Sequence, residues 1–208
     1  MKTIGSTHAS SQTRRRKIIS AALACFAEKG VHATSMEDIR VRAGASNGSI
    51  YHHFKSKEQL AAAVLLEGLR NHQADLLAVL ERQTEARPGI FALVHFHLQW
   101  VEDHPDWARF IFQMREADAA AEVEPDIRRA NRKIFRQLLE WLEGHVRTGA
   151  IKRLPREMYL PLIWGPCLAY ERNRLSGRPM IDSQFAGEVL AESIWASIKG
   201  EAEGGTHG

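Results

Sequence analysis

The chain has 208 residues, of which 44% are hydrophobic and 25% charged, a composition typical of folded globular proteins rather than disordered or fibrous ones. Two cysteines, Cys25 and Cys167, are too few for a disulfide-rich secreted scaffold or a CxxC metal-binding frame. The longest stretch without Asp, Glu, Lys or Arg, from Pro88 to Val101, is too short to span a bilayer. Residues 1–17 are polar and lack the apolar core of an export signal. We therefore expect a soluble protein of a reducing compartment.

The net charge of +3 is unevenly distributed along the chain. Residues 1–57 carry ten basic and three acidic side chains, a net charge of +7, whereas the remainder carries 18 basic and 22 acidic ones, a net charge of −4. A basic segment in front of an acidic body is typical of proteins that bind a polyanion, such as nucleic acid, with one end.

Apolar residues recur at helical spacing along nearly the whole chain, and strand-like alternation is scarce. We therefore predict an all-α fold of about nine helices. The expected helices span residues 11–29, 34–43, 46–53, 56–87, 88–104, 105–116, 125–146, 156–176 and 182–199. Outside them, we expect a flexible tail at residues 1–10, a loop at 117–124 and a disordered tail at 201–208.

Residues with capping character mark several helix ends. Gly44 falls where a helix that began at residue 34 should end. Thr34 and Glu37 have the T-x-x-E spacing of a capping box at the start of that helix. Ser56 and Gln59 have the S-x-x-Q spacing and predict that a long helix opens there.

The eighth predicted helix contains Pro161, Gly165 and Pro166. A proline inside a helix removes an N–H donor and costs about 3 kcal/mol. Two interpretations remain open. The kink frees the carbonyls of Glu157 and Leu162 to face an internal cavity, or it only fits the helix into its bundle.

The expected helices at 34–43 and 46–53, joined by a short turn at Gly44, have the proportions of a helix-turn-helix. Small polar residues at the start of the second helix allow its backbone to approach base edges in the major groove. Hydroxyl, imidazole and ammonium donors follow, which suit phosphate oxygens. These two groups are Asn47, Gly48 and Ser49, then Tyr51, His53 and Lys57.

The run TSMEDIRVRAGASNGSIYHHFKSKEQL, residues 34–60, resembles the DNA-binding signature of the tetracycline-repressor (TetR) family of bacterial transcriptional regulators. The resemblance covers residues 12–66 and implies a homodimer with DNA-binding heads and a ligand-receiving core. It implies a helix-turn-helix domain at 11–57 and a helical effector-binding and dimerisation domain at 58–200. The DNA-binding residues that we derive from it are Thr34, Ser46, Asn47, Gly48, Ser49, Tyr51, His53 and Lys57.

Glu37 has two interpretations within this motif. It is either the capping partner of Thr34 or an acceptor for a cytosine amino group, since an acid at this position cannot bind phosphate.

Aromatic side chains are concentrated after residue 90 and predict either a packed core or the lining of an apolar ligand pocket. The candidate effector-binding residues are His97, Trp100, Phe110, Met114, Trp141, Trp164 and Cys167. His97 and His104 share a helix face, but two turns separate them, so we predict no metal site without a third ligand. Both cysteines are expected in the core, with a redox role for Cys167 as the alternative.

The last predicted helix is apolar on most sides and the one before it is similar, so both need cover on more than one face. We expect a four-helix dimer interface, as the family resemblance implies, although two inner helices of a large monomer would give the same pattern. The candidate interface residues are Leu168, Phe185, Val189, Ile194 and Trp195.

Together these patterns predict a ligand-responsive repressor and not an enzyme, since no catalytic motif stands out. As a homodimer it would bind a palindromic double-stranded DNA operator and be released by a small-molecule effector, with no cofactor and no membrane. The location expected from the resemblance is the bacterial cytoplasm, at the nucleoid. An effector-independent or activating DNA-binding protein of the same fold is the alternative.

Overall fold

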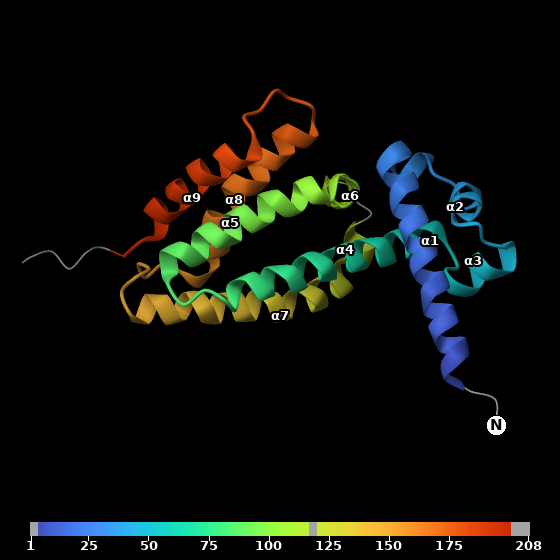
Figure 1. Cartoon of the computed structure of the whole chain (residues 1–208), viewed down its shortest axis with the longest axis horizontal. Helices are drawn as coiled ribbons and strands as arrows, with labels where there is room; N and C mark the ends of the chain where they lie inside the picture. Colours follow the sequence, from blue (N-terminus) through green and yellow to red (C-terminus); the bar gives the residue numbers. More distant parts are fainter. Residues whose placement is uncertain (1–3, 117–119, 201–208) are drawn as a thin grey trace, which may run out of the picture. The chain divides into compact units, whose positions relative to one another are not determined.

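The computed structural model describes residues 4–116 and 120–200, and these parts contain nine α-helices (Figure 1). The helices are α1 (Ile4–Ala33), α2 (Met36–Ala43), α3 (Asn47–His53), α4 (Lys57–Leu80), α5 (Ala86–Asp103), α6 (Pro105–Glu116), α7 (Ala120–Arg147), α8 (Arg156–Leu175) and α9 (Ser183–Ile198). Apart from one isolated bridge between Ile151 and Lys199, the described residues form no β-structure, and the all-α prediction is confirmed. No helix in these two stretches is long and apolar enough to cross a membrane.

Two predicted irregular segments are helical where the structure describes them. The parts of the predicted tails and loop outside the described residues are 1–3, 117–119 and 201–208. α1 begins at Ile4, so most of the expected N-terminal tail is helical. α7 begins at Ala120, and the loop prediction is wrong from there onward. Alanine has the highest helix propensity, so the alanine-rich composition of this stretch favours a helix despite its weak apolar periodicity.

The chain divides into two compact units, here called the head and the body. The head comprises residues 1–70 and 105–127, and the body comprises residues 71–104 and 128–208. The division lies inside α4 rather than at the predicted domain boundary after Lys57, and it assigns α6 to the head.

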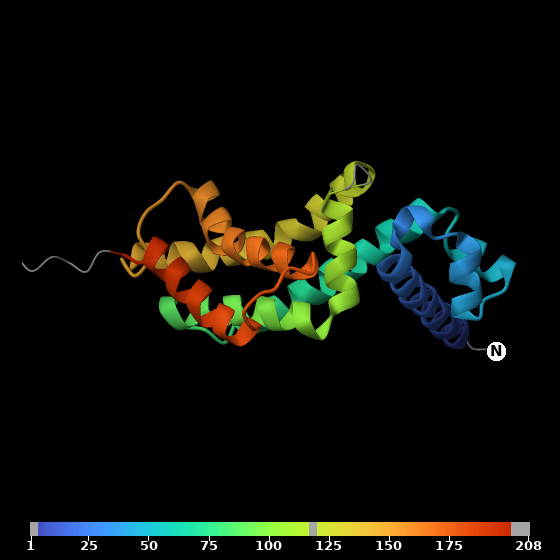
Figure 2. The same ribbon diagram turned by 90° about the horizontal axis from the view of Figure 1, so that it is seen from above.

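The head is built on the apolar face of α1, against which α2 packs (Figure 2). Ile18 and Phe26 on this face are fully buried. α6 packs on α1 as well, and the ring of Phe110 stacks on Phe26 with 5.5 Å between centroids. Full burial of a side chain of this size contributes about 1.5–3 kcal/mol, so this stacking pair is a main support of the head. The other fully buried members of this core are Ile19, Ala22, Ile39, Ile50, Phe54, Leu60 and Val64.

The start of α2 differs from the prediction by one residue. Ser35, not Thr34, is the N-cap, and its hydroxyl accepts a hydrogen bond from the N–H of Asp38 (3.1 Å). The Asp38 carboxylate accepts in return from the Ser35 N–H (2.9 Å). Thr34 instead donates its hydroxyl to the carbonyls of Cys25 and Gly30, so the predicted T-x-x-E capping box is wrong. An S-x-x-D spacing lies one residue later in the sequence and is equally suited to this role.

The S-x-x-Q prediction at α4 is confirmed, since the Ser56 hydroxyl accepts from the Gln59 N–H at 3.2 Å. The Gln59 side chain in turn accepts from the N–H of Lys55 (2.7 Å), one residue before the position that a capping box normally uses. Both ends of this first turn are therefore fixed by side chains.

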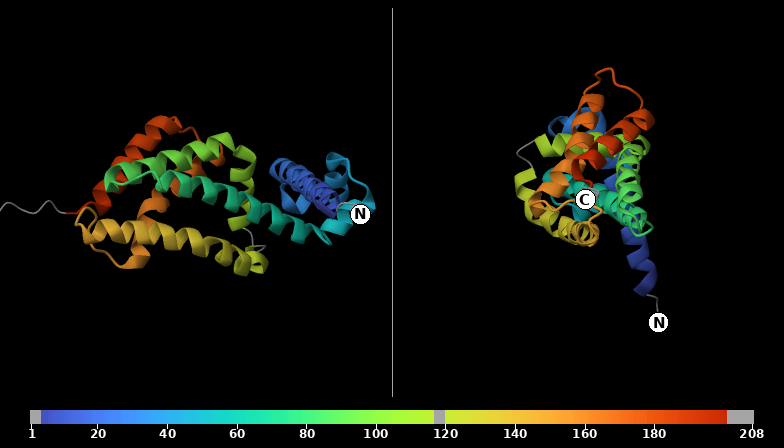
Figure 3. Two further views of the ribbon diagram at one scale, coloured as in Figure 1. Left: turned by 60° about the horizontal axis from the view of Figure 1, so that its bottom comes forward. Right: turned by 90° about the vertical axis from the view of Figure 1, so that its left-hand side faces the viewer.

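In the body, α5 packs on both α8 and α9, and α8 lies beside α9 (Figure 3). Gly187 permits the close approach of α9 to α5, because a Cβ at this position would lie 2.6 Å from the ring of His95. On the side of α7, the indole N–H of Trp141 donates to the carbonyl of Gln83 (3.0 Å). The fully buried side chains include Ile90, Leu93, Val94, Leu142, Ile163 and Cys167.

α8 is a single helix from Arg156 to Leu175 that includes Pro161 and Pro166. An open groove of about 570 Å³ in the body is lined by residues of α4 and α5 and by the start of α9. No residue of α8 lines it, so this groove gives no support to the hypothesis that proline-freed carbonyls face a cavity.

Candidate nucleic-acid interface

The turn between α2 and α3 is fixed by its own backbone. Gly44 adopts the left-handed conformation (φ 59°, ψ 35°), which a residue with a Cβ rarely adopts. Its N–H donates to the carbonyl of Val41, and the next N–H, of Ala45, donates to Arg40. The Arg40 guanidinium then donates to the Ala45 carbonyl (3.1 Å). α2 and α3 are thereby joined as a helix-turn-helix.

α3 presents two of its three predicted base-reading residues to solvent, whereas the hydroxyl of the third, Ser49, is buried. Ser46 caps the helix by accepting from the N–H of Ser49 (3.2 Å), and Ile50 is fully buried in the head core. Asn47 and Gly48 are exposed on the first turn. One face of a short helix is thus anchored while its small polar residues remain accessible to a base edge.

The predicted phosphate donors occupy different environments. Tyr51 is 47% exposed, whereas the Lys57 ammonium donates to the carbonyl of His32 (3.1 Å). Burial lowers the pKa of His53, and the neighbouring positive charges of His52, Arg14 and Arg15 lower it further. His53 is therefore mostly neutral at pH 7 unless an anion approaches it.

At the start of α2 the exposed hydroxyl belongs to Ser35, a residue that the sequence-based selection missed. Thr34 is only 2% exposed and its hydroxyl is used within the head. Ser35 is exposed and caps the helix, so it occupies the position predicted for Thr34. The S-x-x-D spacing with Asp38 was the available signal.

Every acidic side chain among residues 4–57 is paired with a basic one. The pairs are Glu28 with Arg42 (2.7 Å), Glu37 with Arg40 (2.7 Å) and Asp38 with Lys29 (3.1 Å). The hydrogen bonds from Ser35, together with that from Lys29, lower the pKa of Asp38 to about 2. The Arg40 pair lowers the pKa of Glu37, which favours a structural role over cytosine recognition. The remaining basic side chains of residues 4–57 have no acid of this segment to balance them and give it a positive field.

In the body, three of the predicted effector residues lie close together with a residue that was not predicted. His97 lies 5.3 Å from Trp164 between ring centroids, and His72 lies 4.9 Å from Trp100 in the same way. Nε2 of His72 and Nδ1 of His97 are 3.2 Å apart. His72 falls on the helical stripe of Leu69, Leu76 and Leu80, which is the sequence signal that could have identified it.

The other predicted effector residues lie elsewhere. Trp141 packs against Gly89 and His145. Cys167 is fully buried, and burial raises the pKa of its thiol to about 12, which disfavours the reactive thiolate. Phe110 and Met114 are buried in the core of the head.

The predicted dimer residues divide by exposure. Leu168, Phe185 and Val189 are large apolar side chains with exposed fractions of 38%, 57% and 46%. Ile194 is buried in the body core, and Trp195 packs at the edge of that core. Among the described residues, no group of three His, Cys, Asp or Glu side chains is arranged to hold a metal ion.

Comparison with known proteins places the head in a defined family. Residues 18–64 match the model described as bacterial regulatory proteins, tetR family. The chain is 37% identical over 97 residues to the transcriptional repressor KstR2 of Mycolicibacterium smegmatis, which is 43% of this chain and about half (47%) of that relative. It is 26% identical over 195 residues to the transcriptional regulator RutR of Escherichia coli K12, covering 91% of each chain.

Solved structures share this fold over most of the chain. The structure of the transcriptional regulator FadR of Bacillus subtilis in complex with stearoyl-CoA matches with a TM-score of 0.77 and 20% identity, over 88% of this chain and 98% of that one. The helix-turn-helix described above thus lies within a segment, residues 18–64, that matches the tetR family of bacterial regulatory proteins.

Proposed function

We propose that this protein is a homodimeric transcriptional repressor that binds a palindromic DNA operator and is released from it by a small-molecule effector. The observation that carries the proposal is the first turn of α3, where Asn47 and Gly48 are exposed on a helix anchored by Ile50. Such a helix fits the major groove, about 12 Å wide, and the positive field of the head favours binding to phosphate. KstR2 is a repressor by name, whereas FasR of Mycolicibacterium smegmatis, 32% identical over 114 residues, is an activator by name, so the reporter assay below decides the direction of regulation.

The dimer proposal rests on the exposed apolar residues of α8 and α9. Leu168, Phe185 and Val189 project from helices whose opposite sides are buried in the body. Clustered exposed apolar side chains typically mark an interaction surface. A second copy of the chain covers them symmetrically and presents two heads to half-sites about 34–36 Å apart along the DNA.

The effector site that we propose lies at the groove in the body. Its lining includes Phe96 and Trp100, which belong to the same ring cluster as His72. A volume of about 570 Å³ suits a small molecule, and the ring-rich wall favours an aromatic or lipophilic one. FadR, with its stearoyl-CoA, is an example of the fold with such a ligand.

We propose that the connections between head and body couple effector binding to DNA binding. It passes between head and body three times, inside α4, at the junction of α5 and α6, and inside α7. α6 carries Phe110 and Met114 into the head core, so a shift at its start is transmitted to α1. A coupling free energy of about 1–3 kcal/mol changes operator affinity about 5–150-fold, which is sufficient for a switch.

The first experiment is selection of bound sequences from a random duplex pool at a stated salt concentration, with the mass of the protein measured in parallel. We expect enrichment of a palindrome and a dimer. Binding without enrichment, sensitive only to salt, would instead favour a structural DNA-binding protein. A reporter placed behind the selected site then separates repression from activation, and the natural place for both is the cytoplasm, where bacterial DNA lies.

A further inference from the structure

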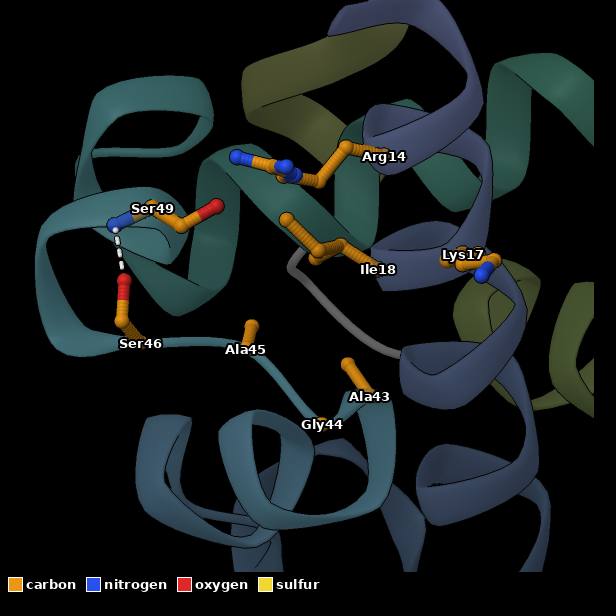
Figure 4. A pocket seen from close by; sticks show the side chains of 8 residues that line it. All are labelled: Arg14, Lys17, Ile18, Ala43, Gly44, Ala45, Ser46 and Ser49. Atoms are coloured by element: carbon orange, nitrogen blue, oxygen red, sulfur yellow. Dashed lines mark hydrogen bonds between the residues drawn. The ribbon is translucent and has the colours of Figure 1, made fainter. Parts of the chain in front are cut away.

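A small pocket of about 390 Å³ lies in the head between α1 and the turn of the helix-turn-helix (Figure 4). Arg14, Lys17 and Ile18 of α1 form one wall. The opposite wall consists of residues 43–46 and Ser49. The pocket is thus bounded by the predicted recognition helix on one side and by a helix outside the motif on the other.

The hydroxyl of Ser49 is an unused polar group in this pocket. Its Oγ is buried and has no hydrogen-bond partner in the described part of the chain. Ser46, the other serine of the pocket, is already engaged, because its Oγ accepts from the Ser49 N–H. Figure 4 shows the Ser49 oxygen directed toward the side of the pocket from which Arg14 extends. Leaving a buried hydroxyl unpaired is unfavourable, which points to a missing partner.

Three basic residues on α1 differ in whether they are engaged within the head. Arg15 is engaged within the head, 3.8 Å from the Glu67 carboxylate and with its guanidinium 5.3 Å from the centre of the Phe54 ring. Arg14 and Lys17 are exposed, line the pocket and make no ion pair with any acid of the described residues. Two cations and a hydroxyl donor around one hollow form a set that suits a phosphate group.

We propose that this pocket binds a phosphate group through Arg14, Lys17 and Ser49, and that the group belongs to the backbone of the DNA bound by α3. The inference rests on the proposed DNA-binding function and deepens it. The pocket includes the cap of α3 and a residue of its first turn, so a phosphate held there fixes the depth and angle at which α3 enters the groove. α1 is then part of the interface as well as support for it.

The test is a methylphosphonate scan, in which one backbone phosphate at a time is made neutral in a duplex selected for binding. Wild-type protein is compared with Arg14→Ala, Lys17→Ala and Arg16→Ala. Arg16 is the matched control, because it has the same charge on the same helix and does not line the pocket. We expect one backbone position at which neutralisation weakens DNA binding by the wild type and by Arg16→Ala about tenfold. At the same position, neutralisation should leave the DNA affinity of Arg14→Ala and of Lys17→Ala unchanged.

Salt dependence gives a second measure on the same proteins. Arg14→Ala should flatten the slope of log affinity against log salt by about 0.9, the value for one phosphate contact. The proposal is overturned if Arg14→Ala keeps the wild-type sensitivity at every backbone position. It is also overturned if Arg16→Ala changes the scan and the slope as much as Arg14→Ala. The loss of affinity would then reflect the overall positive charge of α1 and not a contact in the pocket.

A free anion is distinguished by titrating inorganic phosphate into the protein without DNA and following the amide signals of Gly44 and Ser49. If phosphate shifts these amide signals only when Arg14 is present, and Arg14→Ala leaves the methylphosphonate scan unaltered, the pocket binds a free anion. This outcome would overturn the proposal that the phosphate belongs to the DNA backbone. If the wild type binds no duplex, the proposed function fails, and this titration alone decides on the pocket. Arg14-dependent shifts then support a phosphate site, and no shifts reject it.

Discussion

Head and body differ in how their exposed surfaces are built, although both are packed helices. The head exposes paired acids, free cations and small polar residues around a turn fixed by backbone hydrogen bonds. The body exposes large apolar side chains on α8 and α9 and a groove bordered by rings. The difference teaches that one chain carries two surface chemistries, an electrostatic one that we propose for DNA and an apolar one that we propose for the effector and the second subunit.

The largest expected effect tests whether the head depends on α6. Phe110 belongs to the head core although it is remote from α1–α3 in sequence. Phe110→Ala removes the ring stacked on Phe26 and should lower the free energy of unfolding by about 3–5 kcal/mol. Urea unfolding followed by circular dichroism measures this. A loss below about 1 kcal/mol would show that α6 is not needed for the head.

The next effect concerns the body. Val189→Glu places a charge on the exposed apolar side of α9, 46% exposed in the single chain, and should prevent dimerisation while the fold remains intact. Operator affinity should then fall about 10²-fold or more, because the two half-sites are no longer bound by linked heads. Sedimentation and fluorescence anisotropy measure the two quantities, with Glu188→Gln as a control on the same helix. A dimer of unchanged stability would place the interface elsewhere.

A smaller effect on stability distinguishes the hydroxyls of Ser35 and Thr34 at the start of α2. Ser35→Ala should lower the free energy of unfolding by about 1 kcal/mol, since the N–H of Asp38 loses its cap, and Ser35→Thr should restore most of it. The capping contribution of the Asp38 carboxylate is present above its unfolded pKa and is lost as the pH falls toward about 2. An unchanged thermal midpoint in Ser35→Ala would contradict the assignment of the cap.

The smallest expected effect is on the pH dependence of DNA binding. The pKa of His53 is lowered in the free protein, first by burial and then by nearby positive charge, and an adjacent phosphate would raise it again. Binding then takes up a proton, so duplex affinity should rise a few-fold as the pH falls from about 7.5 to 5.5. His53→Gln should remove this rise, whereas His52→Gln should not. Equal behaviour of the two variants would argue against a phosphate contact by His53.

Sequence patterns located most of the helices and the turn because these features depend on near neighbours. Gly44 and Ser56 each act within four residues of their own position, and both have the predicted roles. The error at Thr34 arose where two capping spacings overlapped, since local rules rank them equally. Only the packing of Thr34 beneath Cys25 and Gly30 decides between them.

Sites formed by segments that are distant in the sequence were harder to predict from sequence patterns. Phe110 and Trp100 are ten residues apart in the sequence, yet Phe110 packs in the head core and Trp100 packs against His72 in the body. His72 and His97 lie on different helices, so no spacing rule connects them. The pocket of Arg14, Lys17 and Ser49 likewise joins α1 to α3 through the tertiary fold.

The sequence by itself determined the all-α class, the helix-turn-helix and the basic character of residues 1–57, because composition and short-range spacing carry that information. The tertiary structure decided the division inside α4, the assignment of α6 to the head and the pairing of each acid of residues 4–57 with a base. These depend on which surfaces meet, and burial of apolar area acts without regard to separation along the chain.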